Sequence, residues 1–342
     1  MSILNWLSGG EGQRGTALCS DPRVKQALEI AVVGIDANLR LAKDYEHRLL
    51  PAIERALEHC AAIAAAIPGP MVLTPEAWSV DPDLRALFAQ ADDIERLLGR
   101  SLELLTFAEQ PAHSGVDDLW AVISMTRTER KVLGWASQGE ILQREVPQRT
   151  VSFARHRLLV PSTNEADLRR EVQWRSYEHL VVEALGHLFR AGVQGRGNGR
   201  VDALLQERLE LLQRARGGLD AWHRPPVMDE SAYLGTRHEL IGNGHALAEL
   251  QRHASMPDEQ LDRVIEILSR PEDFIAVKTI EDRLTALNVM AGNGVEAAAD
   301  LRLALISAKG ARSFTRAAAM VRVNRTHLKP RPIDYAAAEG WL

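Results

Sequence analysis

The spacing of apolar residues changes between residues 111 and 115, and this change limits the fold class more than any other feature. Before it, apolar residues recur three and four apart, as in Leu28, Val32 and Ile35, which is the pattern of one helical face. From Leu119 to Val160, β-branched residues become more frequent and apolar residues alternate with polar ones. The chain is therefore predicted to be α+β and mainly α, with long helical hairpins and a small antiparallel β-sheet.

Helix start signals predict that residues 1–110 form a helical hairpin with long arms. Asp21-Pro22 and Asp81-Pro82 each combine an acidic cap with a proline at the first helical position. Pro51 removes a backbone donor inside the first helical pattern, so we expect the helix to kink or split there. Residues 84–110 are expected to form one continuous helix.

Residues 111–162 are predicted to form the small antiparallel sheet. Four short strands fit the alternation between residues 119 and 160, with a hairpin turn at Gln138-Gly139. Basic residues outnumber acidic ones here, so this sheet would carry a cationic face. Residues 163–295 are assigned to a helical region that starts at the cap Asn164 and includes helices at 258–270 and 272–290.

A mildly acidic chain gathers positive charge in its last region, residues 296–342. Residues 301–333 contain eight Lys or Arg and no Asp or Glu, whereas the whole chain has a formal net charge of −5. A cationic surface raises the local concentration of anions. We therefore expect this segment to bind an anionic partner or nucleic acid. The candidate residues are Arg312, Arg316, Arg322, Asn324, Arg325, Thr326 and Lys329.

The basic segment fits two different structures. In the first, Leu301–Leu305 is a strand, Lys309-Gly310 turns, and Arg312–Val323 returns as a second strand that completes the sheet. In the second, Leu301–Ala308 is a helix and Ser313 caps a further helix. The conformation of residues 312–323 separates the two interpretations.

In the helical interpretation, the sequence SFTRAAAMVRVNRTHLK at residues 313–329 resembles the Fis-type helix-turn-helix at the end of bacterial DNA-binding regulators. The resemblance covers under a tenth of the chain. It implies that Arg316 lies in the first motif helix. It also implies that Asn324, Arg325 and Thr326 lie in a recognition helix that enters the major groove of duplex DNA.

The segment departs from the Fis-type pattern at two places. Arg322 stands in the turn, where the family has a small residue or glycine. Pro330 and Pro332 would end the recognition helix early, because proline has no backbone donor and clashes inside a helix.

Two similar triplets of His and Glu occur in the expected helices. Residues four apart lie on one helical face, so two facing helices could supply imidazoles and carboxylates to zinc, iron or manganese. The competing interpretation is that the first triplet marks the solvent side of its helix, because apolar residues separate its members. The triplets are His179, Glu183 and His187, and His245, Glu249 and His253.

The remaining sequence signals favour a cytoplasmic protein. Cys19 and Cys60 show no metal or redox spacing, and no apolar run reaches the roughly 20 residues that span a bilayer. The sequence has no Gly-x-Ser-x-Gly elbow and no P-loop.

The leading hypothesis is therefore a non-enzymatic scaffold or regulatory interaction protein that needs no cofactor and docks an acidic protein through its basic C-terminal surface. A DNA-binding regulator and a metal-binding helical protein are the alternatives. The long apolar helix faces predict a homodimer.

Overall fold

The computed structural model describes residues 21–138, 141–194, 257–291, 298–310 and 313–329, together with scattered positions between 203 and 246. The chain forms two compact units, each built from segments that are far apart in the sequence. Unit 1 comprises Met1–Ala64, Arg170–Ala276 and Ser307–Phe314. Unit 2 comprises Ala65–Arg169, Val277–Ile306 and Thr315–Leu342.

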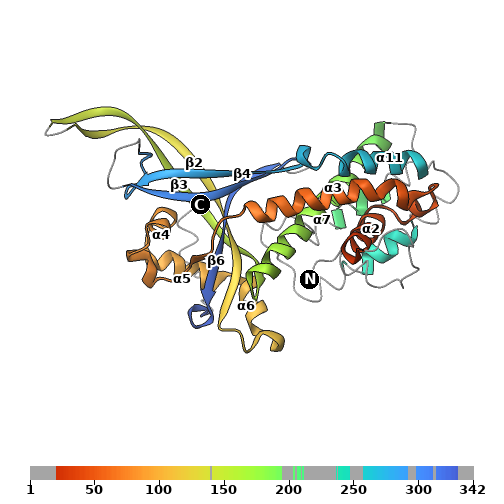
Figure 1. The fold of residues 1–342 in the computed structure, drawn as a ribbon, viewed down its shortest axis with the longest axis horizontal. Coiled ribbons are helices and arrows are strands. Elements are labelled where there is room, and N and C mark those ends of the chain that lie inside the picture. The colour runs from red at the N-terminus through yellow and green to blue at the C-terminus, as the bar shows by residue number, and fades with distance from the viewer. Residues whose placement is uncertain are drawn as a thin grey trace. The chain divides into compact units, whose positions relative to one another are not determined.

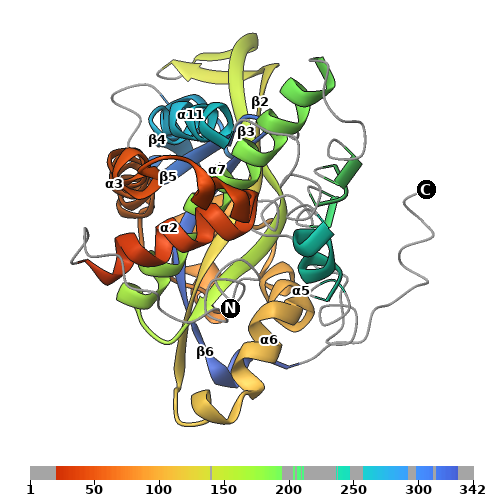
Figure 2. The ribbon, with the colours of Figure 1, turned by 90° about the vertical axis from the view of Figure 1, so that its right-hand side faces the viewer.

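Unit 1 is mainly helical. Its longest helices pack side by side (Figure 2). Side-chain hydrogen bonds link them. The Tyr177 hydroxyl donates to the carbonyl oxygen of Ala27 at 2.9 Å, and the Gln173 side chain donates to that of Leu57 at 3.1 Å. The elements are α2 (Pro22–Ile35), η1 (Ala37–Leu41), α3 (Tyr45–Ala66), most of α7 (Glu165–Gln194), α11 (Pro257–Leu268) and η4 (Pro271–Asp273).

The predicted caps at two helix starts are confirmed, but the predicted split of the helix at Pro51 is wrong. Asp21 accepts a hydrogen bond from the Arg23 amide at 2.8 Å, and Asn164 accepts one from the Asp167 amide at 2.9 Å. Pro51 lies inside the continuous helix α3. The chain breaks earlier instead, where Asp36 adopts an extended conformation and its side chain caps η1.

The expected single helix at residues 84–110 is also wrong, so the first 110 residues are not one long-armed hairpin. Three short helices occupy this segment of unit 2: α4 (Pro82–Leu87), α5 (Ala91–Arg100) and α6 (Leu102–Glu109). The chain leaves the helical conformation at Phe88 and at Ser101. Gln90 and Asp93 then form a reciprocal capping box that starts α5.

A six-stranded sheet replaces the small sheet that the sequence predicted (Figure 1). The strand order is β3-β2-β6-β5-β4, and β1 pairs with β6 in parallel. The sheet is larger than predicted because β4 lies in the segment 272–290 that was expected to be helical, and β5 and β6 from the basic segment join it. The strands are β1 (Met71–Val72), β2 (Asp118–Gln138), β3 (Ile141–Ser162), β4 (Ile275–Thr285), β5 (Ala298–Ala308) and β6 (Phe314–Asn324).

The four short strands expected between residues 119 and 160 are two long ones. β2 and β3 pair along nearly their whole length, from Trp120 opposite Ser162 to Gln138 opposite Ile141. Three register shifts interrupt the pairing. These bulges interrupt the side-chain alternation locally without ending either strand.

The basic segment has the strand conformation of the first interpretation. β6 pairs antiparallel with β2, from Asn324 opposite Asp118 to Ala317 opposite Met125. The two helices of the Fis-type interpretation are therefore not formed by these residues. Only the short helix η5 (Arg325–His327) lies where the recognition helix was expected.

The core of unit 2 lies between helices α4 to α6 and one face of the sheet. Leu84, Leu98 and Leu104 from the helices belong to the same buried cluster as Ile123 of β2 and Val321 of β6. Alternate residues of β6 face this core: Ala317, Ala319, Val321 and Val323.

The connection between β4 and β5 returns to the outer edge of β3. The Met290 amide donates to the Arg149 carbonyl oxygen at 2.8 Å, and the Val151 amide donates to the Asn288 carbonyl oxygen at 2.9 Å. The two edge strands of the sheet, β3 and β4, are thus joined through this connection, and the sheet curls around its core.

Candidate functional site

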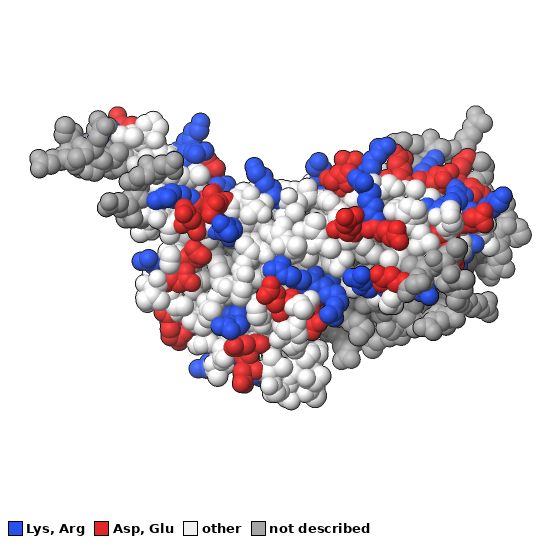
Figure 3. All heavy atoms as spheres, in the orientation of Figure 1, with Lys and Arg blue, Asp and Glu red and all other residues white. Residues whose placement is uncertain are grey.

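The described basic residues of segment 301–333 do not form one continuous surface. Arg302 lies 3.1 Å from Glu281, and Arg322 lies 3.7 Å from Asp118, so each has a carboxylate of its own unit beside it. Lys329 is exposed, and Arg312 lies outside the described residues. On the face drawn in Figure 3, Lys and Arg are mixed with Asp and Glu.

The three residues expected at the start of a recognition helix bind their own chain. The Asn324 side chain accepts hydrogen bonds from the amide and the hydroxyl of Thr326. Arg325 donates to the carbonyl oxygen of His113 at 2.8 Å and to that of Ala108 at the end of α6. These contacts fix the chain after β6 and leave Arg325 partly buried.

Arg316 is different, because it is only 4% exposed. It lies on β6 on the face opposite to the core cluster, beside Ser124 and Thr126 of β2. Its guanidinium donates to the Ser124 hydroxyl at 2.7 Å, to the Thr126 hydroxyl at 3.4 Å and to the Ser124 carbonyl oxygen at 3.1 Å.

A bulge in β3 gives Arg316 its fourth acceptor. Ser124 pairs with Arg157 and Thr126 pairs with Ala154, so Arg155 and His156 together oppose one residue of β2. Arg155 has a φ of 55°, a left-handed conformation that favours glycine. Arg316 donates to the carbonyl oxygen of this bulged residue at 2.7 Å.

The bulge gathers three positive charges, which we call the arginine cluster: Arg155, Arg157 and Arg316. Within the described part of the chain, no carboxylate forms an ion pair with any of them, and the four acceptors of Arg316 are neutral. The Nη1 atom of Arg157 is buried and has no hydrogen-bond partner among these residues. Arg155 is exposed, so the cluster reaches solvent.

Burial and mutual repulsion disfavour the charged forms in this cluster. Burial is the largest cause that lowers the pKa of Arg316, to about 10, and the charges of Arg157 and Arg155 add to it. Burial and the charge of Arg155 also lower the pKa of Arg157. With a pKa of about 10, Arg316 still carries its charge at neutral pH. An anion bound here would offset the repulsion and supply the missing acceptor.

His156, which lies between Arg155 and Arg157 in the sequence, does not neutralise the arginine cluster. Its ring stacks on Phe88 with the ring centroids 4.6 Å apart, and burial lowers its pKa to about 4. It is therefore neutral at neutral pH.

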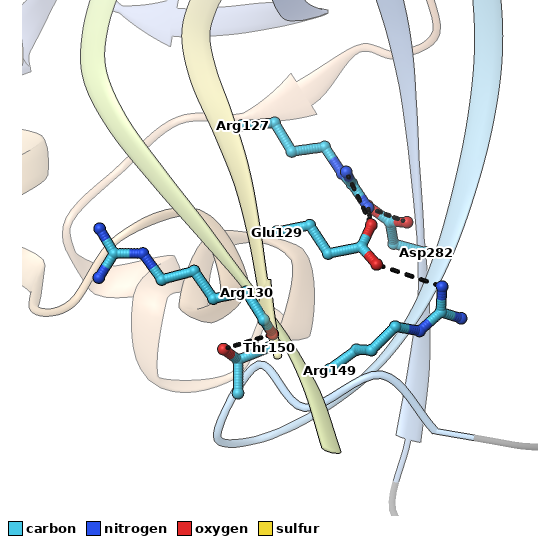
Figure 4. Close-up of polar contacts among 6 residues, drawn as sticks. All are labelled: Arg127, Glu129, Arg130, Arg149, Thr150 and Asp282. Atoms are coloured by element: carbon cyan, nitrogen blue, oxygen red, sulfur yellow. Dashed lines mark hydrogen bonds and ion pairs between the residues drawn. The ribbon is translucent and has the colours of Figure 1, made fainter. Parts of the chain in front are cut away.

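A second group of charged residues on the same hairpin is compensated internally. Arg127 binds the buried carboxylate of Asp282 through two hydrogen bonds, of 2.7 and 2.9 Å (Figure 4). Glu129 approaches Arg127 at 3.5 Å and accepts a hydrogen bond from Arg149 at 3.1 Å. Positive and negative side chains alternate here, so Arg127 and Arg149 each already have a carboxylate beside them.

The proposed metal triplets are only partly described. His179 and Glu183 are buried on α7, so the interpretation that this stripe faces solvent is wrong for them. His187 is exposed and its ring lies edge-on to Phe274. His245 is exposed, and Glu249 and His253 lie outside the described residues. Among the residues that the structure describes, no three His, Cys, Asp or Glu side chains gather as metal ligands would.

Comparison with known proteins gives no relative. No protein-family model matches the chain, and neither a curated protein nor a solved structure matches it. In the described part of the chain, no helix has the length and apolar composition needed to cross a membrane.

The sequence identified one member of the arginine cluster as a site residue and missed two. Arg316 was expected to bind an anion, whereas Arg155 and Arg157 were seen only as part of a basic sheet. The sequence Arg155-His156-Arg157 has no acidic neighbour within seven residues on either side. That local excess of charge was the available signal, but the bulge that turns both residues toward Arg316 was not predictable from it.

Proposed function

We propose that this protein is a non-enzymatic interaction protein that docks an acidic partner protein through the arginine cluster. The observation that supports this function is the uncompensated charge of Arg155, Arg157 and Arg316, together with the buried Nη1 atom of Arg157 that has no acceptor. A buried donor without an acceptor is costly, so a ligand that supplies the acceptor would be bound favourably here.

A carboxylate suits this site on geometric grounds. The planar fork of an arginine matches the two oxygens of a carboxylate, and such charge-assisted hydrogen bonds are worth about 1.5–3 kcal/mol each. A bound Asp or Glu side chain would accept from Arg157 and lie beside Arg155. The scaffold or regulatory role expected from the sequence follows if that carboxylate belongs to another protein.

Duplex DNA is the less favoured partner. Asn324, Arg325 and Thr326 use their side chains within their own chain, and the helix η5 that carries two of them is only three residues long. Phosphate contacts alone would still give salt-dependent binding, so DNA belongs in the test as a separate arm.

The test measures binding of a fluorescein-labelled decaglutamate peptide to the full chain by fluorescence anisotropy. We expect Arg157→Gln to weaken binding about tenfold, which corresponds to the loss of one charge-assisted interaction. Arg100→Gln is the matched control, because Arg100 is an exposed arginine of the same unit and loses the same charge. It should change affinity about twofold or less.

Two results would contradict the proposal. The first is equal weakening by Arg157→Gln and Arg100→Gln, which would indicate only non-specific attraction. The second is tighter binding of a 20-base-pair DNA duplex than of the peptide, with the duplex released by Arg325→Gln, which would favour the DNA-binding alternative.

A further inference from the structure

Most of strand β2 extends beyond its second neighbour. β6 pairs with β2 only as far as Met125, although β2 continues to Gln138. Beyond Met125, β3 is the only described strand that pairs with β2. β2 and β3 therefore continue as a two-stranded ribbon in which one edge of β2 has no neighbouring strand among the described residues (Figure 1).

The contacts of β3 show which backbone groups of β2 face this edge. The Arg149 carbonyl oxygen and the Val151 amide bind the β4–β5 connection, so both point away from β2. Arg149 is opposite Lys131, and Val151 is opposite Glu129. In an antiparallel ladder, residues opposite such outward-facing residues also direct their backbone groups outward. The amides and carbonyls of Glu129 and Lys131 thus point to the open edge.

Leu133 lies two residues beyond Lys131, so its backbone amide and carbonyl also point to this edge. It lies opposite Pro147, which has no amide to donate to β2, as expected for a pair without mutual hydrogen bonds. We call Glu129–Leu133 the open edge. Its residues are exposed, and Leu133 is 70% exposed.

The side chains along the open edge favour an acidic partner. Arg130 and Lys131 are exposed cations, and no carboxylate forms an ion pair with either in the described part of the chain. The single acidic residue, Glu129, already lies between Arg127 and Arg149. A second copy of this chain would bring the same two cations to the edge, whereas an acidic segment would neutralise them.

We infer that the acidic partner docks as an extended strand on the open edge Glu129–Leu133 and continues the sheet there. This inference rests on the proposed function, because it assigns the binding mode of the same acidic partner. Main-chain hydrogen bonds to Glu129, Lys131 and Leu133 supply affinity, and acidic side chains opposite Arg130 and Lys131 supply specificity.

The decisive variant removes one outward amide without touching the ribbon's own ladder. Leu133→Pro deletes the amide that faces the open edge, and Pro147 already occupies the opposite position of the ribbon. Leu133→Thr is the matched control, since it removes the same apolar side chain and keeps the amide. The probe is the fluorescein-labelled decaglutamate peptide, which as a strand places carboxylates on both faces and so reaches Arg130 and Lys131, measured by anisotropy with the full chain.

We expect Leu133→Pro to weaken peptide binding about tenfold and Leu133→Thr to change it about twofold or less. On the unmodified chain, hydrogen exchange should show that the peptide slows the amides of Lys131 and Leu133. The amides of Arg130 and Val132 point to β3 and should change little. Equal affinity of the two variants, with no slowing at Lys131, would overturn the inference.

The outcomes also separate this inference from the proposed function. If Arg157→Gln weakens peptide binding and Leu133→Pro does not, the arginine cluster binds the partner and strand addition is wrong. If neither variant has an effect, both proposals fail. If the chain forms a dimer in sedimentation velocity that Leu133→Pro dissociates, the edge is occupied by a second copy and the acidic strand is rejected.

Discussion

Arg127 contacts two carboxylates in different surroundings, which allows a matched test of ion-pair energetics at the scale of single residues. The Asp282 side chain is 6% exposed and that of Glu129 is 35% exposed. Asp282→Asn leaves a mostly buried guanidinium without its buried counter-charge, and we expect it to lower the free energy of unfolding by about 3 kcal/mol. Glu129→Gln should cost about 0.5 kcal/mol or less, because exposed pairs contribute little. Urea denaturation measures both, and equal effects would contradict the role assigned to burial.

The buried imidazole of His179 makes stability depend on pH. Burial lowers the pKa of His179 from 6.5 to about 4, so the unfolded chain binds the proton more readily between these values. Stability from this group is therefore complete above pH 6.5 and falls as the pH drops toward 4, by about 3 kcal/mol in total. In His179→Gln, the urea midpoint of unfolding should change less between pH 7 and pH 5 than it does in the unmodified chain. If the midpoint changes with pH equally in both proteins, His179 is accessible to protons in the folded state.

The bulge in β3 is the element on which the arginine cluster depends, and its backbone predicts a conflict between stability and binding. Arg155 has a φ of 55° and adds to the repulsion on Arg157 and Arg316. We expect Arg155→Gly to raise the free energy of unfolding by about 1 kcal/mol and to weaken decaglutamate binding. Ser152→Gly, at an exposed position of the same strand, should instead lower stability by about 1 kcal/mol. A destabilised Arg155→Gly variant would show that the bulge is not strained.

Local signals predicted some elements and distant contacts decided others. Asp21 and Asn164 predicted helix starts because a cap acts within three residues of itself. The signal at Gln138-Gly139 was similarly local and marks the end of β2 at Gln138, although Gly139 itself lies outside the described residues. β4 was misassigned because its strand conformation depends on packing of Leu284 and Ile280 against the core of unit 2, which overrides weak helical preference.

The candidate site was harder to predict than the elements that carry it. Arg316 stood out by charge, but its burial follows from the pairing of β6 with β2, nearly 200 residues earlier in the sequence. Arg155 and Arg157 join it only because the β2–β3 register shifts by one residue at Met125. No pattern within one segment specifies such a shift, so the sequence indicated a charged region and the structure defined the site.

At the scale of the whole molecule, unit 2 depends on strands that are distant in the sequence. Ala121 and Ile123 of β2 lie opposite Val321 and Ala319 of β6, and all four side chains are buried. A fragment containing residues 65–169 alone would expose this strand edge and half of the core, so we expect it to lack a cooperative unfolding transition. Fusing residues 277–329 to it through a flexible linker should restore the transition, as followed by circular dichroism during urea denaturation.

The control for this fragment experiment is the same fusion with residues 314–324 in scrambled order. It keeps composition and charge but loses the alternation that places Ala317, Ala319 and Val321 on the core face. We expect no transition from it, because a strand whose apolar residues are out of register cannot cover the core. Cooperative unfolding of residues 65–169 alone would show instead that β6 joins a preformed unit. The arginine cluster would then be completed only when that last strand docks and brings Arg316 against Ser124.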